Sequence, residues 1–208
     1  MNIITVENEG KLRDKCIPIM KEKVDYMNNL INSMIKLMID NNGCGIAAPQ
    51  VGVNKRLFVV VLDNEIIGLF INPTILEHSE ETEIDTEGCL SVPEVCGEVE
   101  RYKTVKIRYF NGKETITEEY DGMNARIIQH EYDHLNGVLY IDKAENIREV
   151  QKENWILKND ELPSAYEEVE ILMVDGSIHR DMIIRGKYGN LEWRNYEDRS
   201  VKAWRNLA

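Results

Sequence analysis

The chain has 208 residues, enough for one ordinary domain with a substantial core, or for one domain and a small appendage. Apolar residues make up 43% and charged residues 30% of it, a composition that excludes an intrinsically disordered chain. The formal net charge of -12 disfavours direct nucleic-acid binding, because a phosphate backbone repels such a chain.

No apolar run approaches the roughly 20 residues that cross a bilayer, and the polar start around Glu7 lacks the pattern of a secretory signal. We therefore expect a cytoplasmic protein without a membrane partner. The four cysteines form no CxxC pair, so we expect reduced thiols and no disulfide framework.

The first predicted element is an amphipathic helix from Val24 to Met38. Apolar residues recur there at intervals of three and four positions, and the Met-rich stripe is typical of core packing. Asn41-Asn42-Gly43 ends the helix, and we expect Gly43 to adopt the left-handed conformation.

Two hairpins follow and predict antiparallel sheet. Residues 56–62 and 66–71 are β-branched and aromatic runs separated by Asp63-Asn64. Residues 105–110 alternate apolar and charged side chains before the turn sequence Asn111-Gly112, as in a half-exposed strand.

A second helical pattern begins at about Asn124 and is closed by Asn136-Gly137. Beyond residue 150 the runs 168–174 and 178–184 flank Asp175-Gly176, which favours a further hairpin. All three tryptophans fall in this last part, so it is expected to form a small packed appendage: Trp155, Trp193 and Trp204.

The second helix carries His130-Glu131-Tyr132-Asp133-His134. Two histidines four positions apart project from one helix face, so they can bind one cation. Glu131 lies between them, where a carboxylate can move protons for a hydrolytic water. The alternative is a polar helix face with satisfied histidines, but the helix ends just beyond His134, where substrate has access.

A catalytic metal of this kind needs a third protein ligand, for which thiolate, imidazole and carboxylate all qualify. Cys89 is a candidate because it lies in Glu87-Gly88-Cys89-Leu90-Ser91, where glycine permits close backbone approach. A lone cysteine is nevertheless more often a small buried apolar residue.

The segment GCGIAAPQ, residues 43–50, combines small residues with the amide donor of Gln50. Small residues leave room for a substrate chain, although such a loop more often marks a tight turn. It is not a phosphate loop, since no Lys-Ser or Lys-Thr follows the glycines.

The three segments together resemble the peptide deformylase family, whose signature is a GxGxAAxQ loop, an EGCLS segment and an HExxH helix in that order. The resemblance implies an α+β fold in which antiparallel sheets surround the central HExxH helix. It covers residues 1–150 as the catalytic domain and leaves 151–208 as a C-terminal extension, expected to be β-rich.

The resemblance also implies an activity, the metal-dependent hydrolysis of the formyl group from N-formyl-methionyl peptides. Cys89, His130 and His134 would bind a divalent metal, with water or hydroxide as the fourth ligand. The family favours Fe²⁺, whereas the ligand set also suits Zn²⁺, Ni²⁺ or Co²⁺.

Further roles follow from the same resemblance. Glu131 would be the general base and acid, while the Gln50 side chain and the Leu90 N–H would hold the formyl oxygen as it gains negative charge. The substrate cleft would be lined by Gly45, Ile46, Glu87 and Gly88, with Ile46 touching the methionine side chain. Glu87 is also a candidate to orient a ligand imidazole.

The sequence departs from the family in three places. Ile46 stands where many relatives have leucine, and Cys96 stands where some carry an arginine near the substrate, a contact that Arg101 would have to supply. Some relatives end in a basic helix that docks on the ribosome, but residues 151–208 carry nine Lys or Arg against eleven Asp or Glu. Docking by that route is unsupported, while a transient ribosome contact stays open.

Two alternatives remain. A zinc endopeptidase would use the same histidines with a third ligand further along the chain, for which Glu149, Glu153 and His179 are available. A catalytically inactive binding module would keep the fold, but a structural zinc needs four protein ligands and only three are evident.

Overall fold

The computed structural model describes residues 2–20, 23–63, 66–150, 156–157, 162–173, 178–185, 191–195 and 201–206. The chain divides into two compact units, Met1–Val150 and Gln151–Ala208. No helix among the described residues has both the length and the apolar character that crossing a bilayer requires.

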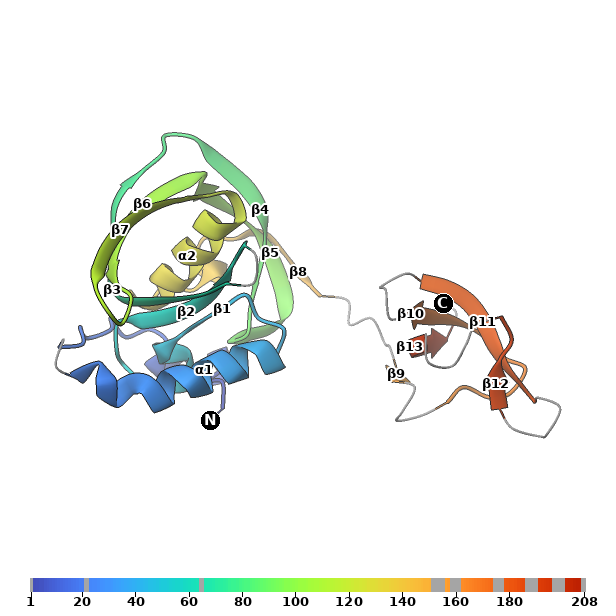
Figure 1. Ribbon diagram of the computed structural model, residues 1–208. Coiled ribbons are helices and arrows are strands. Elements are labelled where there is room, and N and C mark those ends of the chain that lie inside the picture. The colour runs from blue at the N-terminus through green and yellow to red at the C-terminus, as the bar shows by residue number, and fades with distance from the viewer. Residues whose placement is uncertain are drawn as a thin grey trace. The chain divides into compact units, whose positions relative to one another are not determined.

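The described part of the first unit contains two antiparallel sheets and two α-helices (Figure 1). The larger sheet has the order β1-β2-β3-β6-β7 and the smaller sheet the order β4-β5-β8. The strands are β1 (Gly45–Ala47), β2 (Leu57–Leu62), β3 (Ile66–His78), β4 (Thr82–Cys89), β5 (Val92–Tyr102), β6 (Thr104–Phe110), β7 (Thr115–Asp121) and β8 (Glu145–Glu149). The α-helices are α1 (Asn28–Asp40) and α2 (Gly122–His134), and short 3-10 helices are η1 (Val6–Lys11), η3 (Asp25–Met27), η4 (Ala48–Val51) and η6 (Tyr140–Asp142).

The expected α+β fold with antiparallel sheets around the HExxH helix is confirmed. Both predicted hairpins are present, since β2 pairs antiparallel with β3 and β6 with β7. Asn64, in the first of the two predicted turns, lies outside the described residues.

The larger sheet curves around α2 (Figure 1). Its pairing between β3 and β6 shifts register between Ile71 and Thr74 and again between Ile75 and Glu77, and Asn72 adopts a left-handed φ of 50°. Irregularities of this kind bend a strand and increase its twist. The sheet therefore presents a concave face to α2.

Strand β2 shows how both faces of this sheet are buried. Phe58 and Val60 belong to the cluster that includes the apolar face of α2, whereas Leu57 and Val59 belong to the cluster beneath α1. Side chains alternate between the two faces of a strand, so a run of consecutive apolar residues fits a strand covered by a helix on each side.

Helix α1 begins at Asn28, about one turn later than predicted, because η3 precedes it, and it ends at Asp40, two residues beyond Met38. Its Met-rich stripe is buried as expected, with Met34 and Met38 fully covered. The prediction for its last turn was wrong, because Asn42 and not Gly43 adopts the left-handed conformation, with a φ of 53°. The Asn42 N–H donates to Ile39 O and the Gly43 N–H to Met38 O, which satisfies two terminal carbonyls.

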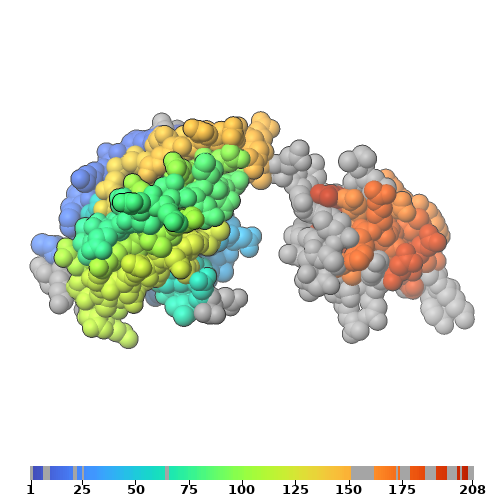
Figure 2. Space-filling model, turned by 90° about the horizontal axis from the view of Figure 1, so that it is seen from above, coloured from blue at the N-terminus to red at the C-terminus, as the bar shows by residue number. Residues whose placement is uncertain are grey.

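Helix α2 is buried on two faces, one apolar and one polar. Ala125 and Ile128 pack into the concave face of the larger sheet. Polar residues spaced three and four positions apart follow the opposite face toward β4 and β5: Arg126, Gln129, His130 and Asp133. In the space-filling view β4 and β5 (green) continue into β8 (orange) as one outer face (Figure 2).

The second unit has a sheet of order β12-β11-β10-β13-β9. Its strands are β9 (Ile156–Leu157), β10 (Glu168–Met173), β11 (Ile178–Arg185), β12 (Leu191–Trp193) and β13 (Val201–Asn206). The antiparallel pairing of β10 with β11 agrees with the predicted hairpin, although its turn, 174–177, lies outside the described residues. Trp193 and Trp204 belong to the buried cluster of this unit, and Trp155 lies outside the described residues.

Candidate metal centre

Three segments far apart in the sequence converge at one end of α2. Cys89 ends β4, at a register shift that follows Gly88, and His130 and His134 lie in the last turns of α2. One ligand atom from each of these three residues lies within 4.8 Å of the others, and Cys89 Sγ is 3.2 Å from His134 Nε2. The structure therefore brings together the three side chains expected to bind metal.

His130 is held by Glu87. The Nδ1 atom of His130 lies 2.9 Å from Glu87 Oε2, and as an N–H it donates to this carboxylate. This contact leaves Nε2 as the nitrogen with a free lone pair, and it is the arrangement that fixes a ligand imidazole in many metal sites. The predicted orienting role of Glu87 is thus supported by a direct contact.

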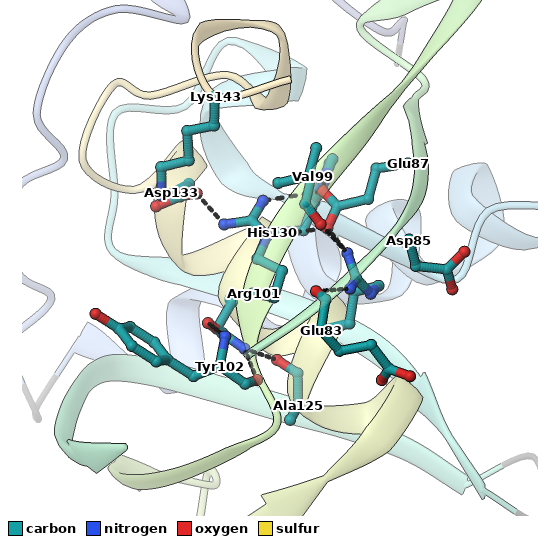
Figure 3. Close-up of polar contacts among 12 residues, drawn as sticks. Glu83, Asp85, Glu87, Val99, Arg101, Tyr102, Ala125, His130, Asp133 and Lys143 are labelled. Atoms are coloured by element: carbon teal, nitrogen blue, oxygen red, sulfur yellow. Dashed lines mark hydrogen bonds and ion pairs between the residues drawn. The ribbon is translucent and has the colours of Figure 1, made fainter. Parts of the chain in front are cut away.

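Glu87 is the centre of a buried ionic network (Figure 3). Arg101 forms two parallel bonds with its carboxylate, each of 2.9 Å, and Arg126 Nη1 lies 2.8 Å from Oε1. Arg101 also donates to Asp133, which forms a second ion pair with Lys143. Burial alone would raise the pKa of Glu87, but the hydrogen bonds from Arg101 and His130 hold it well below its usual range.

Two cleft assignments are corrected by this network. Glu87 is 6% exposed and Arg101 is 4% exposed, and both are occupied by buried ionic partners. Glu87 therefore does not line an open cleft, and Arg101 is not available to replace the guanidinium missing at Cys96. Cys96 itself is half-buried on β5, where its Cα pairs with that of Gly88.

Glu131 is 3% exposed, and its Oε2 atom has no hydrogen-bond partner in the described part of the chain. Burial raises its pKa to about 7, although the charge of His130 acts in the opposite direction. An unpartnered buried carboxylate oxygen costs free energy unless a further group meets it. The carboxylate is thus placed to bind a water molecule or substrate.

Strand β1 packs directly against this carboxylate at Gly45. A Cβ atom built on Gly45 would overlap with Oε1 of Glu131 and would lie 2.8 Å from its Cδ atom. Glycine is therefore required here by the packing of Glu131 and not by backbone conformation.

The neighbouring residue Ile46 does not reach the cleft through its side chain. It is fully buried in the cluster beneath α1, because side chains of β1 alternate and Ile46 faces away from α2. The expected contact between the Ile46 side chain and a methionine is not supported.

Gln50 lies in η4 with its side chain 1% exposed. Its Oε1 accepts the Ala47 N–H at 2.7 Å, so the Nε2 donors face the metal ligands, at 3.5 Å from Cys89 Sγ and 3.2 Å from Ser91 Oγ. Ser91 was not singled out from the sequence, although it belongs to the EGCLS motif. Leu90 lies between Cys89 and Ser91, in the turn that joins β4 to β5.

The remaining predicted cleft residue is Gly88. A Cβ on Gly88 would meet no atom closer than Val95 O, at 3.8 Å. The fold itself leaves this side of β4 open, so the glycine keeps space beside Cys89.

The residues at this centre fit a divalent metal. One thiolate and two imidazoles supply three ligands and leave a coordination position for water or substrate, as in catalytic sites of this class. Without a cation, burial lowers the pKa of His134, whereas the pKa of His130 is about 10 because bonds to Cys89 and Glu87 outweigh its burial. A cation bound between these groups would replace that proton.

Of the three candidate third ligands of an endopeptidase, only Glu149 lies in the described part of the first unit. Glu149 is exposed on β8 and does not belong to the Cys89 cluster, which is the only group of three such ligands among the described residues. Glu153 lies outside the described residues, and His179 lies on β11 of the second unit.

Comparison with known proteins covers the same part of the chain. The family model described as "Polypeptide deformylase" matches residues 1–150. A peptide deformylase of Thermotoga neapolitana is 47% identical over 141 residues, 67% of this chain and 85% of the relative. Peptide deformylase 1 of Clostridium perfringens is 47% identical over 134 residues, 63% of this chain and 89% of the relative.

A solved structure agrees in fold as well as sequence. The crystal structure of peptide deformylase from Thermotoga maritima matches with a TM-score of 0.66 and 42% identity, over 69% of this chain and 97% of that chain. Because the family model covers well over half of the residues, the chain belongs to the polypeptide deformylase family.

Proposed function

We propose that this peptide deformylase acts through a metal held by Cys89, His130 and His134, with Glu131 as the proton carrier. The observation that carries the proposal is the convergence of these ligand atoms within 4.8 Å beside a buried carboxylate that has an unpartnered oxygen. The substrate is the N-formyl-methionyl end of a new polypeptide, and the products are formate and a free α-amino group.

The metal would supply two effects when bound, namely a lower pKa of a water molecule and polarisation of the formyl carbonyl. The donor set of one sulfur and two nitrogens suits Fe²⁺, Zn²⁺, Ni²⁺ or Co²⁺. We propose Fe²⁺ as the native ion, on the family resemblance.

Glu131 has the position and the proton affinity for a general base. Its carboxylate is buried beside the proposed ligands with one oxygen unpartnered among the described residues, and burial raises its pKa, so it can accept a proton and later release it. In this scheme Glu131 takes a proton from the attacking water and delivers it to the leaving amine nitrogen. The C–N bond breaks as that nitrogen becomes protonated.

Negative charge develops on the formyl oxygen during attack, and two donors are proposed to stabilise it. These are the Gln50 Nε2 group, whose direction is fixed by the Ala47 contact, and the backbone N–H of Leu90. A preorganised donor of this kind contributes about 3 kcal/mol to a developing oxyanion.

The substrate backbone is proposed to lie between Gly45 and Gly88. Strand β1 is an edge strand of the larger sheet, so one side of it has no partner strand among the described residues. Small residues on both sides leave room for an extended peptide. Because the proposed substrate is a newly made polypeptide, we also propose a cytoplasmic location and a transient encounter with the ribosome.

The test is formate release from formyl-Met-Ala by protein prepared anaerobically with Fe²⁺, together with metal analysis. Glu131→Ala is expected to keep the metal and lose most of the turnover, whereas Cys89→Ala is expected to lose the metal. Full metal occupancy and turnover in Cys89→Ala would contradict the assignment.

A further inference from the structure

Arg126 lies one helical turn before His130 on the polar face of α2, and its side chain is buried. Its guanidinium makes three hydrogen bonds. Nη1 donates to Glu87 Oε1 at 2.8 Å and to Val99 O at 2.9 Å, and Nη2 donates to Glu83 O at 2.7 Å. One side chain thus joins α2 to the backbones of both β4 and β5 and to the carboxylate that orients His130.

The carboxylate of Glu87 accepts four hydrogen bonds, which use its full acceptor capacity. Two come from Arg101, one comes from Arg126 and one comes from His130. Arg101 bonds to both oxygens of Glu87 and also to Asp133, so it approaches the carboxylate from β5. Arg126 meets Oε1 from the preceding turn of the helix and opposes rotation of the carboxylate about its Cγ–Cδ bond.

We propose that Arg126 is a positioning residue of the metal centre, fixing the ring of His130 through Glu87. The inference rests on the proposed function, since it requires His130 to be a metal ligand. Among the described residues the hydrogen bonds of Arg126 go to Glu87, Val99 and Glu83 and none goes to a proposed ligand.

A purely structural role makes a different prediction, and Gln129 supplies the comparison. Gln129 lies on the same polar face and is buried to a similar degree. Its amide group bonds to Tyr102 O at 2.9 Å, to the Tyr102 N–H at 3.2 Å and to Ala125 O at 3.1 Å, and in the described part of the chain none of these bonds goes to Glu87. Losing either side chain removes buried hydrogen bonds, whereas only the loss of Arg126 removes a hydrogen bond to Glu87.

The experiment compares Arg126→Met with Gln129→Met in the full chain. Metal-free protein is titrated with Co²⁺ against a competing chelator, and the absorption of thiolate-bound Co²⁺ reports the ligand geometry. Arg126→Met is expected to weaken Co²⁺ binding by about 10-fold, the lower end of the roughly 10- to 100-fold effect of removing a direct partner of a ligand, because Arg126 acts through Glu87. Both variants are expected to lower Tm, and Gln129→Met is expected to bind Co²⁺ within about threefold of wild type.

Arg126→Lys is the second variant, and it keeps the charge if Arg126→Met does not fold. A lysine ammonium cannot serve three acceptors in the fixed plane of a guanidinium, so an intermediate Co²⁺ affinity and an altered Co²⁺ spectrum are expected. In the Fe²⁺ enzyme, kcat is expected to fall while KM stays near the wild-type value.

Equal Co²⁺ affinity in wild type and both Arg126 variants would overturn the proposal, and so would an equal loss in Gln129→Met. These outcomes are distinct from failure of the proposed function. In that case Cys89→Ala would bind Co²⁺ as wild type does, with no thiolate band to lose.

Discussion

Replacing Gly45 by alanine tests the packing of β1 against Glu131, the proposed general base. The added Cβ would lie 2.8 Å from both Cγ and Cδ of Glu131 and would overlap with Oε1, so one group must move. Glu131 is 3% exposed and has little room, and overpacking of this kind costs about 1–3 kcal/mol of stability.

The catalytic effect of Gly45→Ala should be larger than its effect on stability. If the carboxylate shifts by about 1 Å to relieve the overlap, a misplacement of that size costs about 100-fold in turnover. Such a loss corresponds to about 2.7 kcal/mol in activation free energy. The three metal ligands are untouched, so the metal content is expected to stay at the wild-type level.

The assay measures formate release from formyl-Met-Ala, metal content and Tm for Gly45→Ala and two control variants. Gly10→Ala adds a Cβ with no atom within 4 Å and is expected to match wild type in all three. Gly88→Ala has no contact closer than 3.8 Å and is expected to keep Tm and metal but to raise KM, because it fills space proposed for substrate. Turnover of Gly45→Ala within twofold of wild type would refute the reasoning.

Three further predictions follow from the same geometry. Glu87→Gln leaves two buried arginines without their carboxylate, so it should lower the free energy of unfolding, measured in urea, by about 3–5 kcal/mol. The control Asp85→Asn, on the exposed side of β4, should change this free energy by less than about 0.5 kcal/mol. Equal effects of the two variants would contradict the ionic network. Burial raises the pKa of the Cys16 thiol to about 11, so at pH 8 about one molecule in a thousand carries the thiolate. Mass spectrometry after alkylation should therefore find Cys44, which is exposed, modified and Cys16 unmodified. Rapid alkylation of Cys16 in the folded protein would contradict its burial. Residues 1–150 expressed alone should fold and keep the wild-type kcat, because the buried clusters around α2 and α1 contain only residues of that range. An insoluble or inactive product would show that the two units depend on each other.

Sequence reasoning found the features that depend on local pattern. The existence of α1 and the β2-β3 and β6-β7 pairing follow from spacing and turn residues. The convergence of Cys89 with the two histidines was expected from the family resemblance. Details that depend on tertiary context were missed. Asn42 was passed over in favour of Gly43 because both residues tolerate a left-handed backbone, and only the carbonyl geometry at the helix end selects between them.

The orientation of β1 was also beyond the motif. The sequence shows that Gly45 and Ile46 are adjacent, but adjacent residues of a strand point to opposite faces. In the structure a Cβ built on Gly45 would point toward Glu131, whereas the Ile46 side chain lies in the core beneath α1. A motif identifies which segment enters a site, whereas the register of the strand decides which of its side chains do.

The smaller sheet shows most clearly why part of the site escaped prediction. In β4 the one buried side chain is Glu87, and it faces a helix stripe that is itself polar. Hydrophobic periodicity cannot reveal an interface in which arginine, glutamine and carboxylate groups are buried against one another, because neither surface is apolar. Such an interface stabilises the fold only when each charge is paired, and removing one partner is strongly destabilising. The same requirement places Arg126 and Glu87 behind His130, so the packing that holds β4 against α2 also orients the imidazole toward Cys89 and His134, the other two proposed metal ligands.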